Sequence, residues 1–208
     1  MATVTHAQSI SGGGVTIQPL PIARTNSGAI GLEDTVGAAK VGQLTTRSDD
    51  DTGTLTMSTG HGFTDGQVID IFWTGGVQYG ATIGTVSTNS VPFDTGIGDD
   101  LPVNNTAITA MVQKSVNLAI DGDNADLIAV ILETTDKSLR TAGHVQFRDV
   151  SNAEIAEVDL VTNVPQVWDI EGGSANPFTG NPITNMKVSQ GGVVEATLKI
   201  VGVQDASP

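Results

Sequence analysis

The segment DLIAVILET, residues 126–134, contains six consecutive apolar residues between Asp126 and Glu133. A strand with one exposed face alternates apolar and polar residues, whereas a strand covered on both faces carries a continuous apolar run. The run therefore predicts a central buried strand. The rest of the C-terminal half can be assigned around it.

Segments typical of strands surround this run. AITAMVQKSVNLAI, residues 107–120, and VVEATLKIV, residues 193–201, alternate apolar with polar residues. HVQFRDV, residues 144–150, and EIAEVDLV, residues 154–161, add two strands joined by a short turn. Short strands separated by Gly, Asn, Asp and Pro predict an all-β fold. We assign residues 104–208 to an antiparallel β-sandwich that is jelly-roll-like.

A second group of strands precedes the sandwich. TGTLTMST, residues 52–59, and VIDIFWT, residues 68–74, flank the corner GHGFTDGQ, residues 60–67. Glycine adopts positive φ at little steric cost, so the three glycines of this corner indicate a turn. GGVQYGATIGTVSTNSVPF, residues 75–93, continues the meander. We predict a small β-barrel-like module over residues 44–103.

Residues 1–43 contain isolated apolar residues among Gly, Thr and Ser and sustain no helical period. This composition predicts an extended N-terminal arm, which we expect to be held by neighbouring subunits. Phe178 lies among turn residues in SANPFTGNPIT, where it would be exposed unless it met a partner. The expected assembly contacts are Val15, Ile17, Leu20, Ile22, Ile30 and Phe178.

The charge distribution argues against nucleic acid as a partner. The net charge is −14, and no Lys or Arg lies between Ser48 and Gln113. Such a surface repels phosphate backbones, so we expect no nucleic-acid binding. The absence of cysteine excludes disulfides and thiolate metal sites. The N-terminal residues lack the pattern of a secretion signal, and no apolar run approaches the ~18 residues of a membrane span, so we expect a protein made in a cytoplasm and no membrane partner.

Two local patterns invite a chemical interpretation. His61, between two glycines and near Asp65, would be a general base in one reading and a turn histidine bonded to backbone groups in the other, which we favour. DGDNAD, residues 121–126, begins like a calcium loop, but Ala125 and Asp126 occupy the fifth and sixth positions, where Asp or Asn and then Gly are required. We therefore predict no catalytic residue, cofactor or metal.

A family resemblance follows from the same corner. The strand, the sequence HGFTDGQVIDIF and the following hairpin resemble small β-barrel modules of bacteriophage virion proteins, which carry an HG…GD-V or HG…GQ-V pattern. The matching residues are His61, Gly62, Gly66, Gln67 and Val68, with Gln67 where Asp is expected. The resemblance covers about a quarter of the chain and implies a structural protein of a tailed-phage particle.

The leading hypothesis is a capsid decoration or cement protein, assembled in the host cytoplasm and located in the virion. Its partners would be the major capsid protein and further copies of itself, with a trimer favoured. A tail, adaptor or fibre component is a neighbouring alternative. A carbohydrate-binding module would use Trp73, Tyr79, Trp168 and Phe178 as stacking residues. A glycan-degrading enzyme would need converging carboxylates, for which Asp121, Asp123 and Glu171 are nominal candidates.

Overall fold

The computed structural model describes residues 10–12, 15–17, 28–96, 101–120, 125–170, 173, 175–178 and 183–204. Within these ranges the chain forms 16 strands and no helix, which confirms the all-β prediction. The described residues accordingly contain no helix long and apolar enough to span a bilayer.

The chain divides into two compact units. One, the sandwich unit, comprises residues 1–36, 115–188 and 196–208, and the other, the barrel unit, comprises residues 37–114 and 189–195. The chain therefore passes between the units four times. Each unit is built from segments that are distant in sequence.

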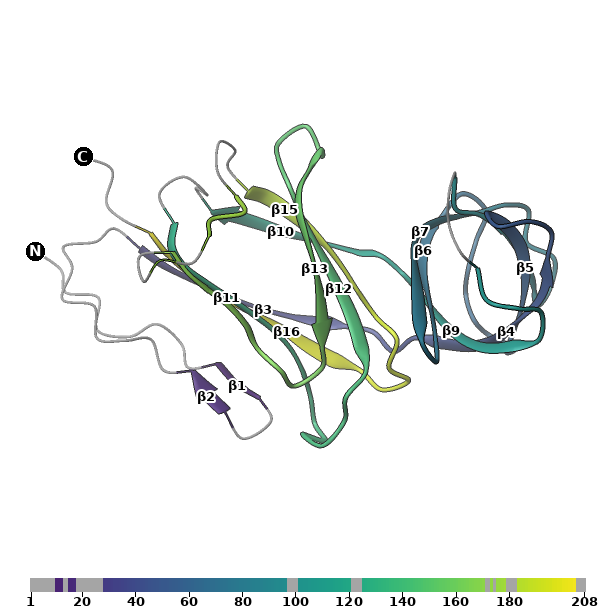
Figure 1. The fold of residues 1–208 in the computed structure, drawn as a ribbon, viewed down its shortest axis with the longest axis horizontal. Helices are drawn as coiled ribbons and strands as arrows, with labels where there is room; N and C mark the ends of the chain where they lie inside the picture. Colours follow the sequence, from purple (N-terminus) through teal and green to yellow (C-terminus); the bar gives the residue numbers. More distant parts are fainter. Residues whose placement is uncertain are drawn as a thin grey trace, which may run out of the picture. The chain divides into compact units, whose positions relative to one another are not determined.

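The sandwich consists of two four-stranded sheets with the orders β14-β11-β16-β3 and β10-β15-β12-β13 (Figure 1). If these eight strands are numbered along the chain, the two orders become 6-3-8-1 and 2-7-4-5. This is the arrangement of an eight-stranded jelly roll, so the jelly-roll-like prediction is confirmed. The strands are β3 (Gly28–Val36), β10 (Lys114–Ile120), β11 (Ala125–Thr134), β12 (Ala142–Arg148), β13 (Glu154–Val161), β14 (Gln166–Asp169), β15 (Ile183–Gln190) and β16 (Ala196–Gln204).

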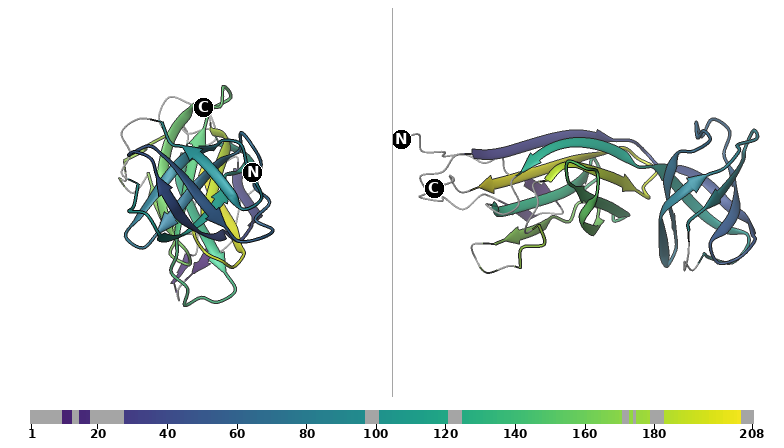
Figure 2. Two further views of the ribbon diagram at one scale, coloured as in Figure 1. Left: turned by 90° about the vertical axis from the view of Figure 1, so that its right-hand side faces the viewer. Right: turned by 90° about the horizontal axis from the view of Figure 1, so that it is seen from above.

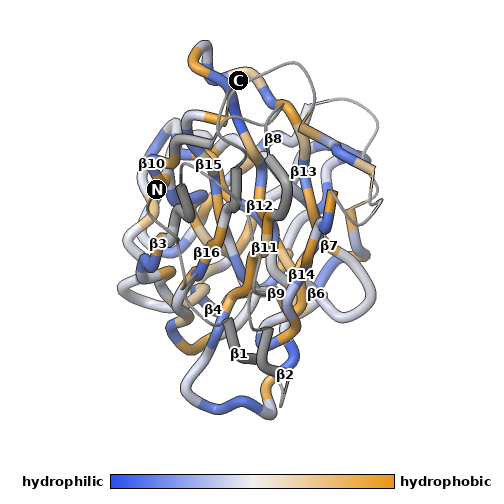
Figure 3. Tube along the Cα trace, turned by 90° about the vertical axis from the view of Figure 1, so that its left-hand side faces the viewer, coloured by the Kyte–Doolittle hydropathy of each residue, from blue (hydrophilic) through white to orange (hydrophobic). Residues whose placement is uncertain are grey.

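Strand β11 lies between β14 and β16 and carries the apolar run that opened the sequence analysis. Val130 pairs with Ile200 of β16 and Gln166 of β14, and Leu132 pairs with Leu198. In Figure 3 much of β11 and β16 is coloured as hydrophobic. The continuous run thus specifies a strand with a hydrogen-bonded neighbour on each side and buried residues on both faces.

Three aromatic rings fill part of the sandwich core. Phe147 of β12 packs edge-on against Trp168 of β14 and Phe178, with ring centroids 6.0 and 4.8 Å away, and the centroids of Trp168 and Phe178 are 5.4 Å apart. Phe178 is 0% exposed. The expectation that Phe178 would be an exposed residue of its loop is therefore wrong, because the ring folds inward onto two other aromatic rings.

The barrel unit is a closed six-stranded barrel with the order β4-β5-β8-β7-β6-β9. Its strands are the blue to teal ones that curl into a barrel in the right-hand view of Figure 2. Alternate residues of its strands point inward and form one hydrophobic cluster, which includes Leu55, Ile69 and Val91. Closure removes the sheet edges that would otherwise be open to pairing. The strands are β4 (Lys40–Arg47), β5 (Thr52–Met57), β6 (Val68–Trp73), β7 (Gly76–Ile83), β8 (Ser90–Asp94) and β9 (Thr106–Val112).

The unit boundaries differ from the predicted 1–43, 44–103 and 104–208. β3 belongs to the sandwich rather than to an arm, since it pairs along its whole length with β16, from Val36 with Ala196 to Gly28 with Gln204. β4 begins at Lys40, and β9 closes the barrel by pairing with both β4 and β6. Pairing between distant segments leaves little local signal, which is why the boundaries could not be predicted.

The segment 189–195 returns to the barrel unit and is held by a buried carboxylate. Asp70 of β6 is 0% exposed and accepts hydrogen bonds from the N–H of Gly80 at 2.8 Å, Nε2 of Gln113 at 2.9 Å and the hydroxyl of Ser189. In the same segment, the hydroxyl of Thr109 donates to the carbonyl of Gly191 at 2.8 Å. These contacts anchor the returning segment on β6 and β9.

We predict that Asp70→Ala lowers the stability of the barrel unit by about 1–3 kcal/mol, because the buried Ser189 hydroxyl and two part-buried donors lose their acceptor. Chemical denaturation followed by tryptophan fluorescence from Trp73 measures the effect. The matched control is Glu195→Ala, an exposed position of the same unit, which should change stability by less than about 0.5 kcal/mol. Equal stability of the two variants would contradict the anchoring role.

Candidate assembly surface

The outer face of the β14-β11-β16-β3 sheet is apolar where the outer face of an isolated sandwich would be polar. Because side chains alternate along a strand, Ile128, Val130 and Leu132 face the core. Their neighbours on β11, Ala129 and Ile131, face outward. The cross-strand register adds Val201 of β16 to the same outer side, opposite Ala129.

The outward apolar residues are nevertheless buried. The exposed fractions are 1% for Ala129, 0% for Ile131 and 4% for Val201. We call these three residues the outer apolar face. Full burial of an Ile or Val side chain contributes roughly 1.5–3 kcal/mol, so this face needs a cover.

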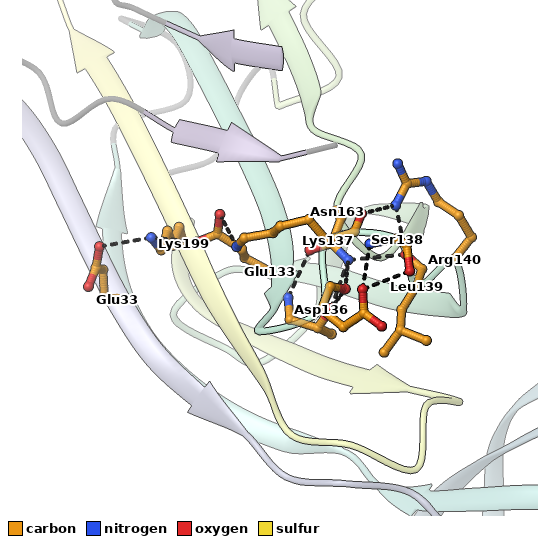
Figure 4. Close-up of polar contacts among 10 residues, drawn as sticks. Glu33, Glu133, Asp136, Lys137, Ser138, Leu139, Arg140, Asn163 and Lys199 are labelled. Carbon is orange, nitrogen blue, oxygen red and sulfur yellow. Dashed lines mark hydrogen bonds and ion pairs between the residues drawn. The ribbon is translucent and has the colours of Figure 1, made fainter. Parts of the chain in front are cut away.

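The cover is a two-stranded hairpin near the N-terminus. Its strands, β1 (Ile10–Gly12) and β2 (Val15–Ile17), pair with each other in antiparallel register. β1 lies against β11 and β16, as Figure 4 also shows. The opposite sheet fills the inner side of β11, so the hairpin lies on the outer side.

Charged residues adjoin the outer apolar face, since Lys199 of β16 pairs across the strands with Ile131. Lys199 contacts Glu133 at 2.6 Å and Glu33 at 3.6 Å, and Lys137 also pairs with Glu133 (Figure 4). Burial raises the pKa of Glu133, but the hydrogen bonds from Lys137 and Lys199 outweigh it, so the pKa is lower than usual. The hydrogen bond to Glu133 raises the pKa of Lys199.

The loops that follow β11 and β13 are joined by one buried amide. Asn163 is 1% exposed, and its Oδ1 accepts from the N–H of Thr134 at 2.9 Å. Its Nδ2 donates to the hydroxyl of Thr134 at 2.7 Å and to the carbonyls of Leu139 and Asp136 at 3.0 and 3.2 Å. Asn163 adopts a φ of 61°, which asparagine tolerates better than most residues. This network fixes the end of β11 that carries Glu133.

Of the predicted assembly residues, three lie in described strands, two lie outside the described residues and one lies in the core. Val15 and Ile17 lie in β2 of the covering hairpin, and Ile30 lies in β3, at the edge of the sheet. Leu20 and Ile22 lie outside the described residues. The buried ring of Phe178 has no exposed area to offer a neighbouring subunit. The sequence analysis missed the outer apolar face itself, although the two-sided apolar run of β11 was its signal.

Within each unit, the predicted stacking residues pack against other side chains. Trp168 packs with Phe147 and Phe178 in the sandwich unit. In the barrel, Trp73 packs against the hydrophobic cluster, whereas Tyr79 lies edge-on to Phe72 at 6.4 Å. Consecutive residues of a strand point to opposite faces, so Trp73 and the Phe72–Tyr79 pair lie on opposite faces of β6. Within the barrel, Trp73 and Tyr79 therefore do not build a common platform for a sugar.

His61 has the geometry of a turn residue. Its Nε2 donates to the carbonyl of Thr88 at 3.0 Å, and its Nδ1 accepts from the N–H of Phe63 at 3.0 Å, which fixes the tautomer. Asp65 instead accepts from the N–H of Val86 at 2.7 Å. Both ring nitrogens are occupied by backbone groups, so His61 joins the glycine-rich corner to the β7–β8 connection and is not paired with Asp65.

Among the acidic residues, Asp49 also has the geometry of a turn residue. Oδ1 of Asp49 accepts from the N–H groups of Asp51 and Thr52 and from the hydroxyl of Thr52, and these bonds lower its pKa. Asp49 thus closes the β4–β5 turn. Asp121, Asp123 and Glu171 lie outside the described residues. Among the residues that are described, no group of three or more His, Asp or Glu side chains is placed to hold a metal ion.

No protein-family model, curated protein or solved structure matched this chain. Arguments about function therefore depend on the chain's own surfaces.

We predict that Glu133 makes the stability of the sandwich unit depend on acid pH. Its pKa is lower in the folded state than the usual value near 4.5, so its contribution is present above that value and is lost as the pH falls through the folded-state pKa. Wild type should therefore be more stable than Glu133→Gln at neutral pH, and the difference should shrink in acid. Denaturation midpoints measured across this range test it, with the exposed Glu154→Gln as control. A difference that is unchanged in acid would contradict the prediction.

Proposed function

We propose that this chain is a structural virion protein that decorates and stabilises a phage capsid. Its partners are the major capsid protein and neighbouring copies of itself in a homo-oligomer, with a trimer favoured, and it has no catalytic role. The observation that carries the proposal is the outer apolar face, which is covered by a short hairpin instead of being replaced by polar residues.

The jelly roll supports the proposal by analogy, since double-sheet jelly rolls recur in viral capsid proteins. They also occur in lectins and other proteins, so the fold alone does not decide the function. The surface adds the physical argument. The outer apolar face depends on the hairpin that covers it, so the segment that supplies this cover could also bind a neighbouring subunit.

The mechanism would be mechanical. The N-terminal segment and the sheet edges, which are β3, β14, β10 and β13 among the described strands, would contact adjoining subunits. Weak contacts repeated around a symmetric oligomer add through avidity. The added interface would oppose the pressure of packaged DNA. A tail, adaptor or fibre component would use the same surfaces and would differ from a decoration protein only in the protein that it binds.

Co-sedimentation with expanded, undecorated capsids of the phage that encodes the chain tests the proposal. We expect the full chain to sediment with capsids and a chain that starts at Gly28 to remain in the supernatant. This truncation removes β1 and β2 but keeps β3, which the jelly roll requires. Circular dichroism of the truncated chain verifies that both units remain folded.

Two substitutions sharpen the test. Val201→Asp places a charge on the outer apolar face and should weaken capsid binding at least tenfold, whereas Val161→Asp, at a position that is 43% exposed on β13, should leave it unchanged. If the full chain does not bind capsids at all, decoration is rejected and isolated tails become the next binding partner to test.

A further inference from the structure

We infer that in the oligomer the outer apolar face of each copy is covered by the β1–β2 hairpin of a second copy of this chain, so that neighbours are joined by exchanged hairpins. The inference deepens the proposed assembly role and rests on it, because exchange needs a neighbour. It assigns a partner, an identical chain, to the face formed by Ala129, Ile131 and Val201.

The hairpin is separate from the sheet that it covers. β1 and β2 form a two-stranded sheet of their own, and neither strand is hydrogen-bonded to β11 or β16. A two-stranded hairpin is at best marginally stable in water, so it depends on the surface beneath it. Since backbone pairing does not join it to the four-stranded sheet, a hairpin from another chain can occupy the face through the same contacts.

The chain between the hairpin and the sandwich is long enough for exchange. Ten residues, 18–27, separate Ile17 at the end of β2 from Gly28 at the start of β3. A chain of this length spans at most roughly 33–36 Å, which is about the diameter of a small domain. The hairpin can therefore reach the equivalent face of an adjacent copy.

Charge favours an identical chain as the partner. The protein has a net charge of −14, so two copies repel each other over most of their surface. Residues 1–32 contain no Asp or Glu, and Arg24 is their one Lys or Arg. The N-terminal segment is thus one of the parts of the chain that another acidic copy does not repel. The three residues of the outer apolar face are uncharged, although Lys199 lies directly across from Ile131.

Exchange also explains how such a small contact could join subunits. A hairpin exchanged in trans makes the contacts that it makes in cis, so the exchange loses no contact energy. Each closed oligomer then contains one such contact for every copy, and a copy leaves only when the hairpin that it gives and the hairpin that it receives are both released. Exchange therefore slows the dissociation of the oligomer without adding contact area.

Photo-crosslinking of isotopically mixed protein tests the inference. Thr16→benzoylphenylalanine places a photoreactive group in β2. Equal amounts of ¹⁴N- and ¹⁵N-labelled chains are unfolded together and refolded, which requires no thiol chemistry because the protein has no cysteine. After irradiation, mass spectrometry identifies which peptides are joined to the hairpin and whether the two carry the same label.

The expected result is crosslinks from the hairpin to peptides of β11 or β16, with about half of them joining a light to a heavy peptide. Crosslinks to these strands that always join peptides of the same label would overturn the inference, because the hairpin would then cover its own chain. Crosslinks that avoid β11 and β16 altogether would also overturn it.

Two controls keep the readout specific. Val150→benzoylphenylalanine, at a turn position that is 81% exposed, should give no crosslinks to β11 or β16. Adding Val201→Asp to the Thr16 variant should remove the mixed-label crosslinks, while circular dichroism reports whether the fold is kept. The crosslinking experiment contains no capsid, so the absence of mixed-label crosslinks rejects hairpin exchange without rejecting capsid binding. Conversely, a failure to bind capsids in the co-sedimentation experiment does not change the crosslinking result.

Discussion

Everything in the sandwich unit depends on the two-sided burial of β11. Its backbone is hydrogen-bonded to β14 on one side and β16 on the other, so it cannot move to an edge without breaking both ladders. Its inner residues fill the core of the jelly roll, and its outer residues require a second cover. A single run of six apolar residues therefore creates both the stability of the unit and its need for a further layer.

The strands and the fold class could be predicted because they follow from local periodicity. Alternation in residues 52–59 and 68–74 predicted β5 and β6, and the continuous run predicted β11. The assignment of β3 failed for a physical reason. GAIGLEDTV places Ile30, Leu32 and Val36 on one face, but its glycines and Asp34 weaken the pattern of a strand. Its partner β16 lies 160 to 176 positions later in the chain, and no short window of sequence reveals that pairing.

The candidate site was predicted only in part. The two-sided apolar run was visible, but which side would face the core and what would cover the other side depend on register. Phe178 was considered as a surface residue because its neighbours are turn residues, whereas a core position was favoured for Trp168 over a stacking role. In the structure Phe178 is buried and Trp168 is half-buried, and both pack against Phe147 of another strand. His61 was correctly read as a turn residue, since glycines on both sides favour a corner. Location in a virion stays a prediction.

The two-segment construction of the barrel has a consequence for the order of events on the ribosome. Ser189 joins Asp70 across 119 positions, and Gly191 joins Thr109 across 82. At about 5–20 residues per second, Ser189 is synthesised about 6–24 s after Asp70. During that interval β4 to β9 can already have left the ribosome, while Asp70 lacks the hydroxyl that completes its site. The six strands of the barrel are thus translated before β10 to β16, but the barrel is completed only when segment 189–195 arrives, after β10 to β15 have been synthesised.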